Sequence, residues 1–235
     1  MARLGAGRGL SVPLPAMNAE LTVGGTRFVL LPQRAAWLPE HGTLLVADVH
    51  IGKAATFRRL GVPVPQGTTS DAVERLGALV QATGADHLIV LGDLLHGRLG
   101  RAAATLERFA RWREAHAALR MTLVRGNHDD RSGDPPPEWR VDVLDGPLRL
   151  GGLALVHDPQ PVPGAYAVGG HVHPCAWIGR GHDRLRLPCF HFGAEVAVLP
   201  AFGDFTGMHA LPQAEDDRIY VVAADQVRRV APTGR

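Results

Sequence analysis

Seven polar side chains in this 235-residue sequence could bind metal ions, because they combine carboxylate, carboxamide and imidazole donors. They are Asp48, His50, Asp93, Asn127, His157, His171 and His173. Such a mixed oxygen and nitrogen set suits divalent first-row metals and needs no thiolate. Asp93 is the candidate that bridges two ions, because its carboxylate has one oxygen for each. Two ions about 3.5–4 Å apart can hold a hydroxide between them, and this hydroxide attacks phosphorus in line. The predicted chemistry is hydrolysis of a phosphate ester.

Two pairs of these candidates are separated by a single residue, Asp48 with His50 and His171 with His173. Alternate side chains of an extended segment point the same way, so both members of a pair can face one site. The residues before His171 are glycines, which let the backbone come close to bound metals. Each histidine of the second pair could therefore serve a different ion.

Two further histidines are candidates for catalysis and not for metal binding. In Gly126-Asn127-His128-Asp129, Asn127 offers a neutral oxygen ligand, so the adjacent His128 can face the substrate. A histidine there is suited to general-acid work, in which it protonates the departing oxygen. His96 follows Asp93 by three residues and is placed to orient or assist His128.

Taken singly, several of these residues have ordinary structural explanations. Asp48 or Asp93 alone could cap a helix that follows a strand, and His157 alone could be a satisfied core histidine. The joint pattern favours a metal site, because five candidates recur at the same kind of position. The remaining histidines are interpreted as surface or packing residues: His41, His87, His116, His182, His191 and His209.

The shared position is the end of an apolar, β-branched run, which predicts a buried strand. The five runs span residues 44–47, 88–92, 122–126, 153–156 and 167–170. In open α/β sheets, ligands gather beyond the carboxyl ends of the strands. The candidates are therefore expected to meet in one site.

Helical patterns separate the early strands. An apolar stripe at Val73, Leu76, Leu79 and Val80 predicts one helix, and a second is predicted over residues 101–119. This alternation predicts βαβ crossovers, whereas the Gly151-Gly152 turn and the closely spaced strands after Val141 predict a more antiparallel second half. The expected fold class is α/β, with two packed mixed β-sheets flanked by helices. Residues 1–18 are rich in glycine and proline and are expected to be a loose tail, before a single domain over residues 19–235.

Composition restricts the class of protein without identifying it. The 25 basic residues nearly balance the 23 acidic ones, so any contact with nucleic acid must come from a local patch. Two cysteines, Cys175 and Cys189, are too few for a disulfide scaffold and are interpreted as small buried hydrophobic residues. No apolar run of about 18 residues occurs, so we expect a soluble, cytoplasmic protein without membrane association.

The motifs together resemble the calcineurin-like metallophosphoesterase superfamily. They are Asp48-Val49-His50, Gly92-Asp93, Gly126-Asn127-His128-Asp129, His157 and Gly170-His171-Val172-His173. The resemblance implies one metal on Asp48, His50, Asp93 and His173, and a second on Asp93, Asn127, His157 and His171. It also implies that His128 assists at the phosphate, and that the fold is an αββα sandwich.

A narrower resemblance covers more of the chain. Segments 47–53, 57–63, 92–96, 186–190 and 199–207 are similar to the PdeM subgroup, the ligase-associated DNA damage response endonucleases. These are bacterial enzymes encoded with a helicase, a DNA ligase and an exonuclease. The resemblance therefore implies manganese-dependent cleavage of DNA, and His96 resembles a histidine of the related repair nucleases.

The substrate is less constrained than the metals. Arg58, Arg59 and Arg125 lie near the motifs and could contact a phosphate backbone, but Arg58 and Arg59 could equally be a solvated helix face. Single-stranded DNA is the favoured substrate, and loops near residues 131–140 and 158–165 could gate access. The alternatives are a small-molecule phosphodiesterase acting on a nucleotide or nucleotide-lipid, and a non-catalytic module that recruits repair proteins. His128 and His96 argue against the module, because a scaffold needs no histidine at a reacting phosphate.

Overall fold

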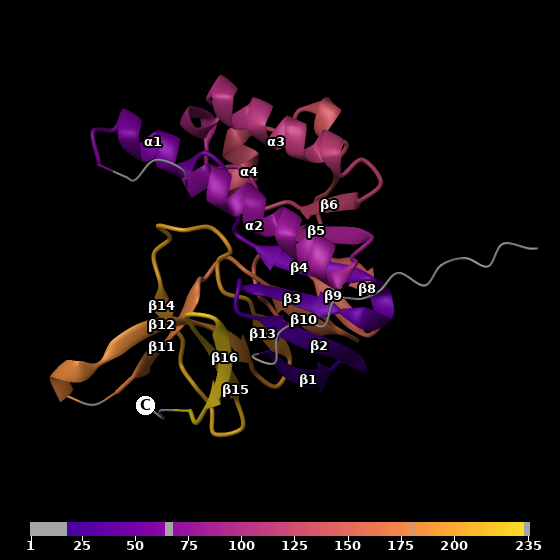
Figure 1. Cartoon of the computed structure of the whole chain (residues 1–235). Coiled ribbons are helices and arrows are strands. Elements are labelled where there is room, and N and C mark those ends of the chain that lie inside the picture. Colours follow the sequence, from indigo (N-terminus) through magenta and orange to yellow (C-terminus); the bar gives the residue numbers. More distant parts are fainter. Residues whose placement is uncertain (1–17, 64–67, 180, 233–235) are drawn as a thin grey trace, which may run out of the picture.

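Two β-sheets pack against each other in the computed structural model, and helices lie on the outer face of one of them (Figure 1). The structure describes residues 18–63, 68–179 and 181–232. Residues 1–17 of the predicted N-terminal tail lie outside this part of the chain.

The first sheet has seven strands that lie in sequence order, β1 to β7. They are β1 (Ala19–Val23), β2 (Thr26–Leu31), β3 (Ala35–Leu38), β4 (Thr43–Ala47), β5 (His87–Leu91), β6 (Arg120–Val124) and β7 (Asp142–Leu144). The first four strands pair antiparallel, and β4 to β7 pair parallel. The predicted βαβ crossovers are therefore present, preceded by an antiparallel meander that periodicity did not predict.

Four α-helices accompany this sheet: α1 (Lys53–Arg59), α2 (Thr68–Thr83), α3 (Ala103–Ala115) and α4 (Asn127–Ser132). The apolar stripe of α2 packs with Phe109 and Trp112 of α3 against the strands, as predicted for α2. Helix α3 is shorter than the predicted span 101–119. It ends at Ala115, where the Trp112 carbonyl accepts both the backbone N–H of His116 and a hydrogen bond from its ring.

The second sheet has nine strands and is mainly antiparallel, as predicted for the later half of the chain. They are β8 (Leu148–Leu150), β9 (Leu153–Leu155), β10 (Tyr166–Gly169), β11 (Pro174–Ile178), β12 (Leu185–Phe192), β13 (Val196–Val198), β14 (His209–Ala210), β15 (Arg218–Ala223) and β16 (Gln226–Val230). Short 3₁₀ turns occur at Pro39–His41, Arg98–Gly100, Pro137–Trp139 and Gly181–Asp183.

The core between the sheets is a cluster of buried apolar side chains from both. Phe28 and Ile89 of the first sheet meet Leu155, Val168 and Phe192 of the second. Two mixed sheets packed together with helices confirm the predicted fold class. Cys175 and Cys189 are buried free thiols, as interpreted from the sequence. No helix in the described residues is long and apolar enough to cross a membrane.

Parallel pairing explains why the candidate ligands can meet. The last residues of β4, β5 and β6 are aligned, since Ala47 pairs with Leu91 and Leu91 pairs with Val124. Strands β9 and β10 are also parallel, with Leu155 opposite Val168. All five predicted strands are present, and those within each sheet end together. The loops after them therefore emerge at shared edges.

Candidate metal centre

Four polar atoms converge around the ring of His157. Its Nδ1 lies 3.0 Å from the carbonyl oxygen of Leu91, which can only accept, so the proton is on Nδ1 and Nε2 carries a lone pair. This Nε2 lies 3.0 Å from Asn127 Oδ1 and 3.6 Å from Asp93 Oδ1. The Nδ1 of His171 lies 3.1 Å away. Electron-rich atoms this close repel one another unless a cation lies among them.

A second set of atoms surrounds Asp48. The Nε2 of His173 lies 3.6 Å from Asp48 Oδ1, and the Nδ1 of the same ring contacts the carbonyl of Gly207 at 3.1 Å. His173 Nε2 is therefore also a lone-pair donor. Asp48 Oδ1, His173 Nε2 and both ring nitrogens of His50 are buried without a hydrogen-bond partner. Buried polar atoms are almost always paired, so these orphaned atoms fit a bound cation.

Asp93 faces both sets, and one oxygen points to each. Its Oδ2 lies 4.0 Å from His50 Nε2, and its Oδ1 lies 3.6 Å from His157 Nε2. In two groups of three residues, one ligand atom from each residue lies within 4.8 Å of the other two: Asp48, His50 and His173, and Asp48, Asp93 and His157. Asp48 occurs in both of these groups and Asp93 in one, and the bridging role of Asp93 remains a prediction. The residues fit two divalent ions.

Burial makes this arrangement costly without positive charge. The side chains of Asp48 and Asp93 are 0% and 3% exposed, and burial raises the pKa of Asp93. Burial also lowers the pKa of His50 far below its ordinary value, so His50 cannot supply a compensating proton. Two buried carboxylates without a cationic partner cost several kcal/mol each by the order-of-magnitude desolvation penalty. Divalent cations would offset that cost.

The backbone is strained at the same residues. Asp48, His50, Asp93, His171 and His173 all adopt positive φ, between 51° and 63°. L-residues rarely occupy this left-handed region, and such strain clusters at functional sites. The conformation lets adjacent loops cross closely, with hydrogen bonds from Asp48 and His50 N–H groups to the Asp93 loop. The pairs Asp48 with His50 and His171 with His173 are therefore not placed by the simple alternation of an extended strand that the sequence analysis assumed.

Glycines make room for the side chains of the centre. A Cβ at Gly92 would lie 2.0 Å from His157 Nδ1, and one at Gly126 would lie 2.4 Å from Asp93 Oδ1. At Gly170 it would lie 2.5 Å from Asp48 Oδ2, the oxygen that accepts the His171 N–H. These glycines are required because the loops after β5, β6 and β10 pack closely against the side chains of the centre.

Replacing Gly170 with alanine is therefore expected to displace Asp48 and to lower both metal content and activity. Overpacking of this kind costs roughly 1–3 kcal/mol of stability. Gly146→Ala is the matched control, because its added Cβ meets nothing within 4 Å. Metal analysis, activity and thermal unfolding of the two variants measure the difference. Unchanged metal content in Gly170→Ala would contradict this role.

Asp129 is a positioning residue to which sequence reasoning assigned no role. Its buried carboxylate accepts the backbone N–H groups of Asp93 at 2.7 Å, Gly126 at 3.0 Å and Leu95 at 3.2 Å. Burial raises its pKa to about 6. The carboxylate joins the loop after β5 to the loop after β6. The sequence did contain a sign of this role, because Asp129 is the last residue of the Gly126-Asn127-His128-Asp129 motif.

His128 and His96 lie beside the candidate metal ligands and form a stacked pair, with ring centroids 5.0 Å apart. His128 Nε2 lies 3.9 Å from Asp93 Oδ2, and its side chain is 33% exposed. The backbone N–H of His128 donates to Asp93 Oδ1 at 2.9 Å. Both rings also contact His50 edge to face. Burial lowers the pKa of His96 to about 4, so His96 is a neutral neighbour.

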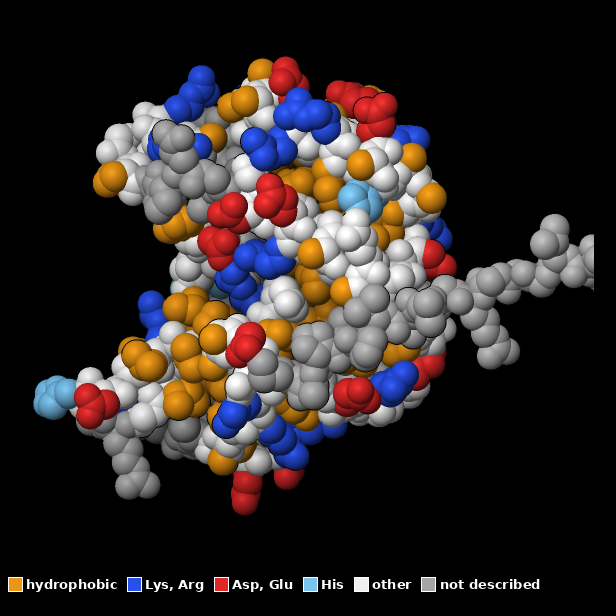
Figure 2. Space-filling view, viewed as in Figure 1, with side chains coloured by type: hydrophobic (Ala, Val, Ile, Leu, Met, Phe, Trp, Pro, Cys, Tyr) orange, Lys and Arg blue, Asp and Glu red, His pale blue; other side chains and the backbone are white. Residues whose placement is uncertain are grey.

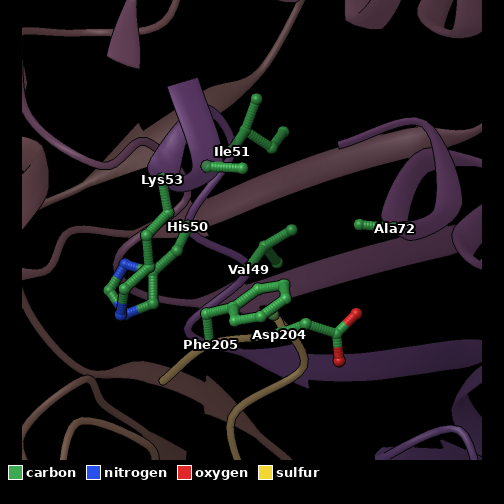
Figure 3. Close-up of a pocket in the computed structure, with 9 residues that line it drawn as sticks. Val49, His50, Ile51, Lys53, Ala72, Asp204 and Phe205 are labelled. Atoms are coloured by element: carbon green, nitrogen blue, oxygen red, sulfur yellow. The ribbon is translucent and has the colours of Figure 1, made fainter. Parts of the chain in front are cut away.

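A loop from the far end of the chain closes one side of the centre. Figure 3 shows Asp204 and Phe205 of this loop together with His50, Val49 and Lys53, which line one small cavity. Arg34 and Arg75 both form ion pairs with Asp204, and Arg75 also donates to the Phe202 carbonyl. Lys53, the first residue of α1, contributes positive charge near His50 and both carboxylates.

The predicted DNA contacts occupy different environments. Arg58 and Arg59 are exposed in the last turn of α1, next to the cavity that contains Lys53. Arg125 instead forms ion pairs with Asp130, Asp134 and Asp145. Its charge is already balanced by carboxylates.

The two loops suggested as gates are attached to the body of the protein. Arg101 donates to the carbonyls of Ser132, Gly133 and Asp134, and Arg113 donates to that of Trp139. In the other loop, the Pro163 carbonyl accepts a hydrogen bond from Arg149 of β8 at 3.1 Å. The gating role remains a prediction.

Residues 42–193, which include all seven candidate ligands, match the calcineurin-like phosphoesterase family, and the chain belongs to that family. It is a metal-dependent phosphoesterase. Among solved structures, it is similar to a nuclease, MPE, from Pseudomonas putida. The two share 39% sequence identity with a TM-score of 0.81, over 91% of this chain and 100% of that chain. This match is consistent with the nuclease subgroup indicated by the sequence motifs.

A more distant solved structure is Yfce, a phosphoesterase from E. coli. It shares 20% identity with a TM-score of 0.41, over 80% of this chain and 98% of that chain. A comparison with curated proteins gave no match.

Proposed function

We propose that this phosphoesterase is a manganese-dependent endonuclease that cuts single-stranded or locally unpaired DNA, in the context of DNA repair. The observation that carries the proposal is the pair His128 and His96 beside the ligand sets, with the His128 ring partly open to solvent. The similarity to a Pseudomonas putida nuclease over the whole of that chain supports a nucleic-acid substrate.

The charge of the centre favours a phosphodiester. Asp48 and Asp93 together balance one divalent ion, so a second ion leaves excess positive charge that attracts the singly charged diester. Lys53 adds positive charge on the α1 side. When bound, the two ions would supply Lewis acidity and an activated water for attack on phosphorus.

The protein side chains would then handle the leaving group. His128 Nε2 lies close to Asp93 without a hydrogen bond to it, at 3.9 Å, and can hold the proton that the departing oxygen receives. His96 stacks on His128 and fixes the plane of its ring. Metal binding and proton transfer would thus be carried out by different residues.

Manganese is favoured by the donor chemistry. The set contains imidazoles as well as oxygens, and magnesium prefers octahedral all-oxygen surroundings with several waters. We expect two ions per chain, with manganese more active than magnesium.

A single strand suits the shape of the surface. Figure 2 shows a recess in the surface between α1 and the β11–β12 hairpin, which are labelled in the same view in Figure 1. Lys53 of α1 and Pro174 and Pro188 of the hairpin line the cavities beside His50 and His173. A flexible strand can turn a phosphate into this recess, whereas a continuous duplex is stiff.

The test is an activity screen of purified protein with manganese. Its substrates are bis(nitrophenyl) phosphate, a nitrophenyl monoester, circular single-stranded DNA and matched duplex DNA. We expect cleavage of the diester and internal cleavage of the single strand in preference to duplex. Raising the salt concentration should slow DNA cleavage, because phosphate contacts release counterions.

Exhaustive chelation is the control and should remove all activity, with recovery on addition of manganese. Full activity after chelation would refute metal dependence. Rapid hydrolysis of a cyclic nucleotide or nucleotide-lipid with DNA left intact would instead identify a small-molecule phosphodiesterase.

A further inference from the structure

The hairpin formed by β11 and β12 extends away from the second sheet (Figure 1). In the outer half of this hairpin, Trp177 pairs with Arg186 across the strands and Ile178 pairs with Leu185. The Trp177 residue is 39% exposed, although tryptophan is usually largely buried. An indole held open on a projecting hairpin is available to a ligand.

Two arginines lie next to this indole. The Arg184 Cζ lies 5.0 Å from the centre of the Trp177 ring, and the Arg186 Cζ lies 5.8 Å from it. Both arginines are exposed, and neither forms an ion pair with a carboxylate in the described part of the chain. The cluster therefore combines an aromatic surface with two uncompensated positive charges. This combination binds single-stranded nucleic acid, through base stacking and phosphate contacts.

The cluster faces the metal centre side of the hairpin. Alternate residues of a strand share a face, so Arg186 and Pro188 lie on one face of β12, and Trp177 lies on the same face of the hairpin because it pairs with Arg186. Pro188 lines a cavity of about 180 Å³ together with His173, Arg34, Phe205 and Met208. Arg186 also donates to the Met208 carbonyl at 3.3 Å. Arg186 therefore joins Trp177, its partner across the strands, to the Met208 loop that lines the cavity beside His173.

We propose that Trp177, Arg184 and Arg186 form a platform that binds single-stranded DNA beside the cleaved phosphodiester. A base stacks on Trp177, and the guanidinium groups contact flanking phosphates. The platform rests on the proposed function, because it positions the strand whose phosphate enters the metal centre. It is a binding element and takes no part in proton transfer.

The test compares kinetics on two substrates. Trp177→Ala should lower kcat/KM for single-stranded DNA about tenfold, mainly through KM, since aromatic stacking contributes substantially per base. Hydrolysis of bis(nitrophenyl) phosphate should be unchanged, because that substrate reaches only the metal centre. Leu185→Ala is the matched control, as this exposed residue lies on the opposite face of the hairpin.

Two further variants separate stacking from charge. Trp177→Phe should retain DNA cleavage, yet it should remove the fluorescence quenching that a thymidine oligonucleotide produces before metal is added. Arg184→Ala should reduce the slope of log kcat/KM against log salt by about 0.7, the value for one phosphate contact on a single strand. Arg111→Ala removes an exposed charge from α3 and should leave the slope unchanged.

The outcomes distinguish this proposal from the proposed function. If the wild type hydrolyses the small diester but neither binds nor cuts DNA, the DNA substrate is wrong and the platform with it. If the wild type cuts DNA and Trp177→Ala cuts it equally well, only the platform is wrong. Loss of a concentration-dependent dimer in Trp177→Ala, with DNA kinetics unchanged, would show that the cluster binds a second copy of the chain.

Discussion

Asp93→Ala is expected to abolish phosphodiester hydrolysis and to remove bound metal more completely than His50→Ala does. Asp93 directs one oxygen to each ligand set, at 4.0 Å from His50 Nε2 and 3.6 Å from His157 Nε2. In the proposed arrangement of two ions, loss of Asp93 would disturb both of them, whereas His50 would bind only one. The loss of rate should exceed the roughly 10–100-fold that removal of an outer hydrogen-bonding partner of a ligand costs.

Metal content and thermal unfolding provide readouts independent of catalysis. Manganese should raise the unfolding temperature of the wild type, because a ligand that binds only the folded state adds about 2.7 kcal/mol at a hundred times its Kd. Asp93→Ala should lose this response, and His50→Ala should keep part of it. Equal residual rates and equal metal contents in the two variants would contradict the bridging role of Asp93.

His128→Ala is expected to lower DNA cleavage by about 10²–10⁴-fold, the usual contribution of a general acid, and to spare much of the hydrolysis of bis(nitrophenyl) phosphate. A deoxyribose alkoxide is a poor leaving group and needs a proton, whereas nitrophenolate leaves readily without one. The His128 ring lies outside both ligand sets, so metal content should be unchanged. His41→Ala, which removes a histidine whose ring contacts Thr26, is the control.

Two results would assign His128 a different role. Loss of bound metal in His128→Ala would identify a ligand or a structural histidine. Equal losses on both substrates with metal retained would indicate stabilisation of charge instead of proton donation.

Much of the frame was predictable because it depends on local pattern. The runs before Asp48 and Asp93 are short, apolar and β-branched, and both are buried strands. The stripe of α2 at Leu76 and Leu79 packs into the core. Boundaries were less predictable, as α3 shows, since its end depends on contacts with neighbouring residues. The antiparallel meander β1 to β3 was missed, because its short strands carry no distinctive spacing.

The details of the centre depended on contacts between distant residues. Arg34 reaches Asp204, and Asp129 joins two loops by binding the backbone of Asp93. The position of Trp177 relative to His173 follows from the pairing of β11 with β12. Residue spacing within a short segment cannot predict such contacts between distant parts of the chain.

The sequence by itself determined which residues could bind metal and that they follow strands, because residue chemistry and apolar periodicity are properties of short segments. Only the tertiary structure decided how they are shared. Asp48 belongs to both candidate ligand groups because the loop after β10 crosses close to the end of β4 at Gly170, where the His171 N–H donates to Asp48 Oδ2. That contact joins residues far apart in the chain, and its energy depends on the packing of both sheets.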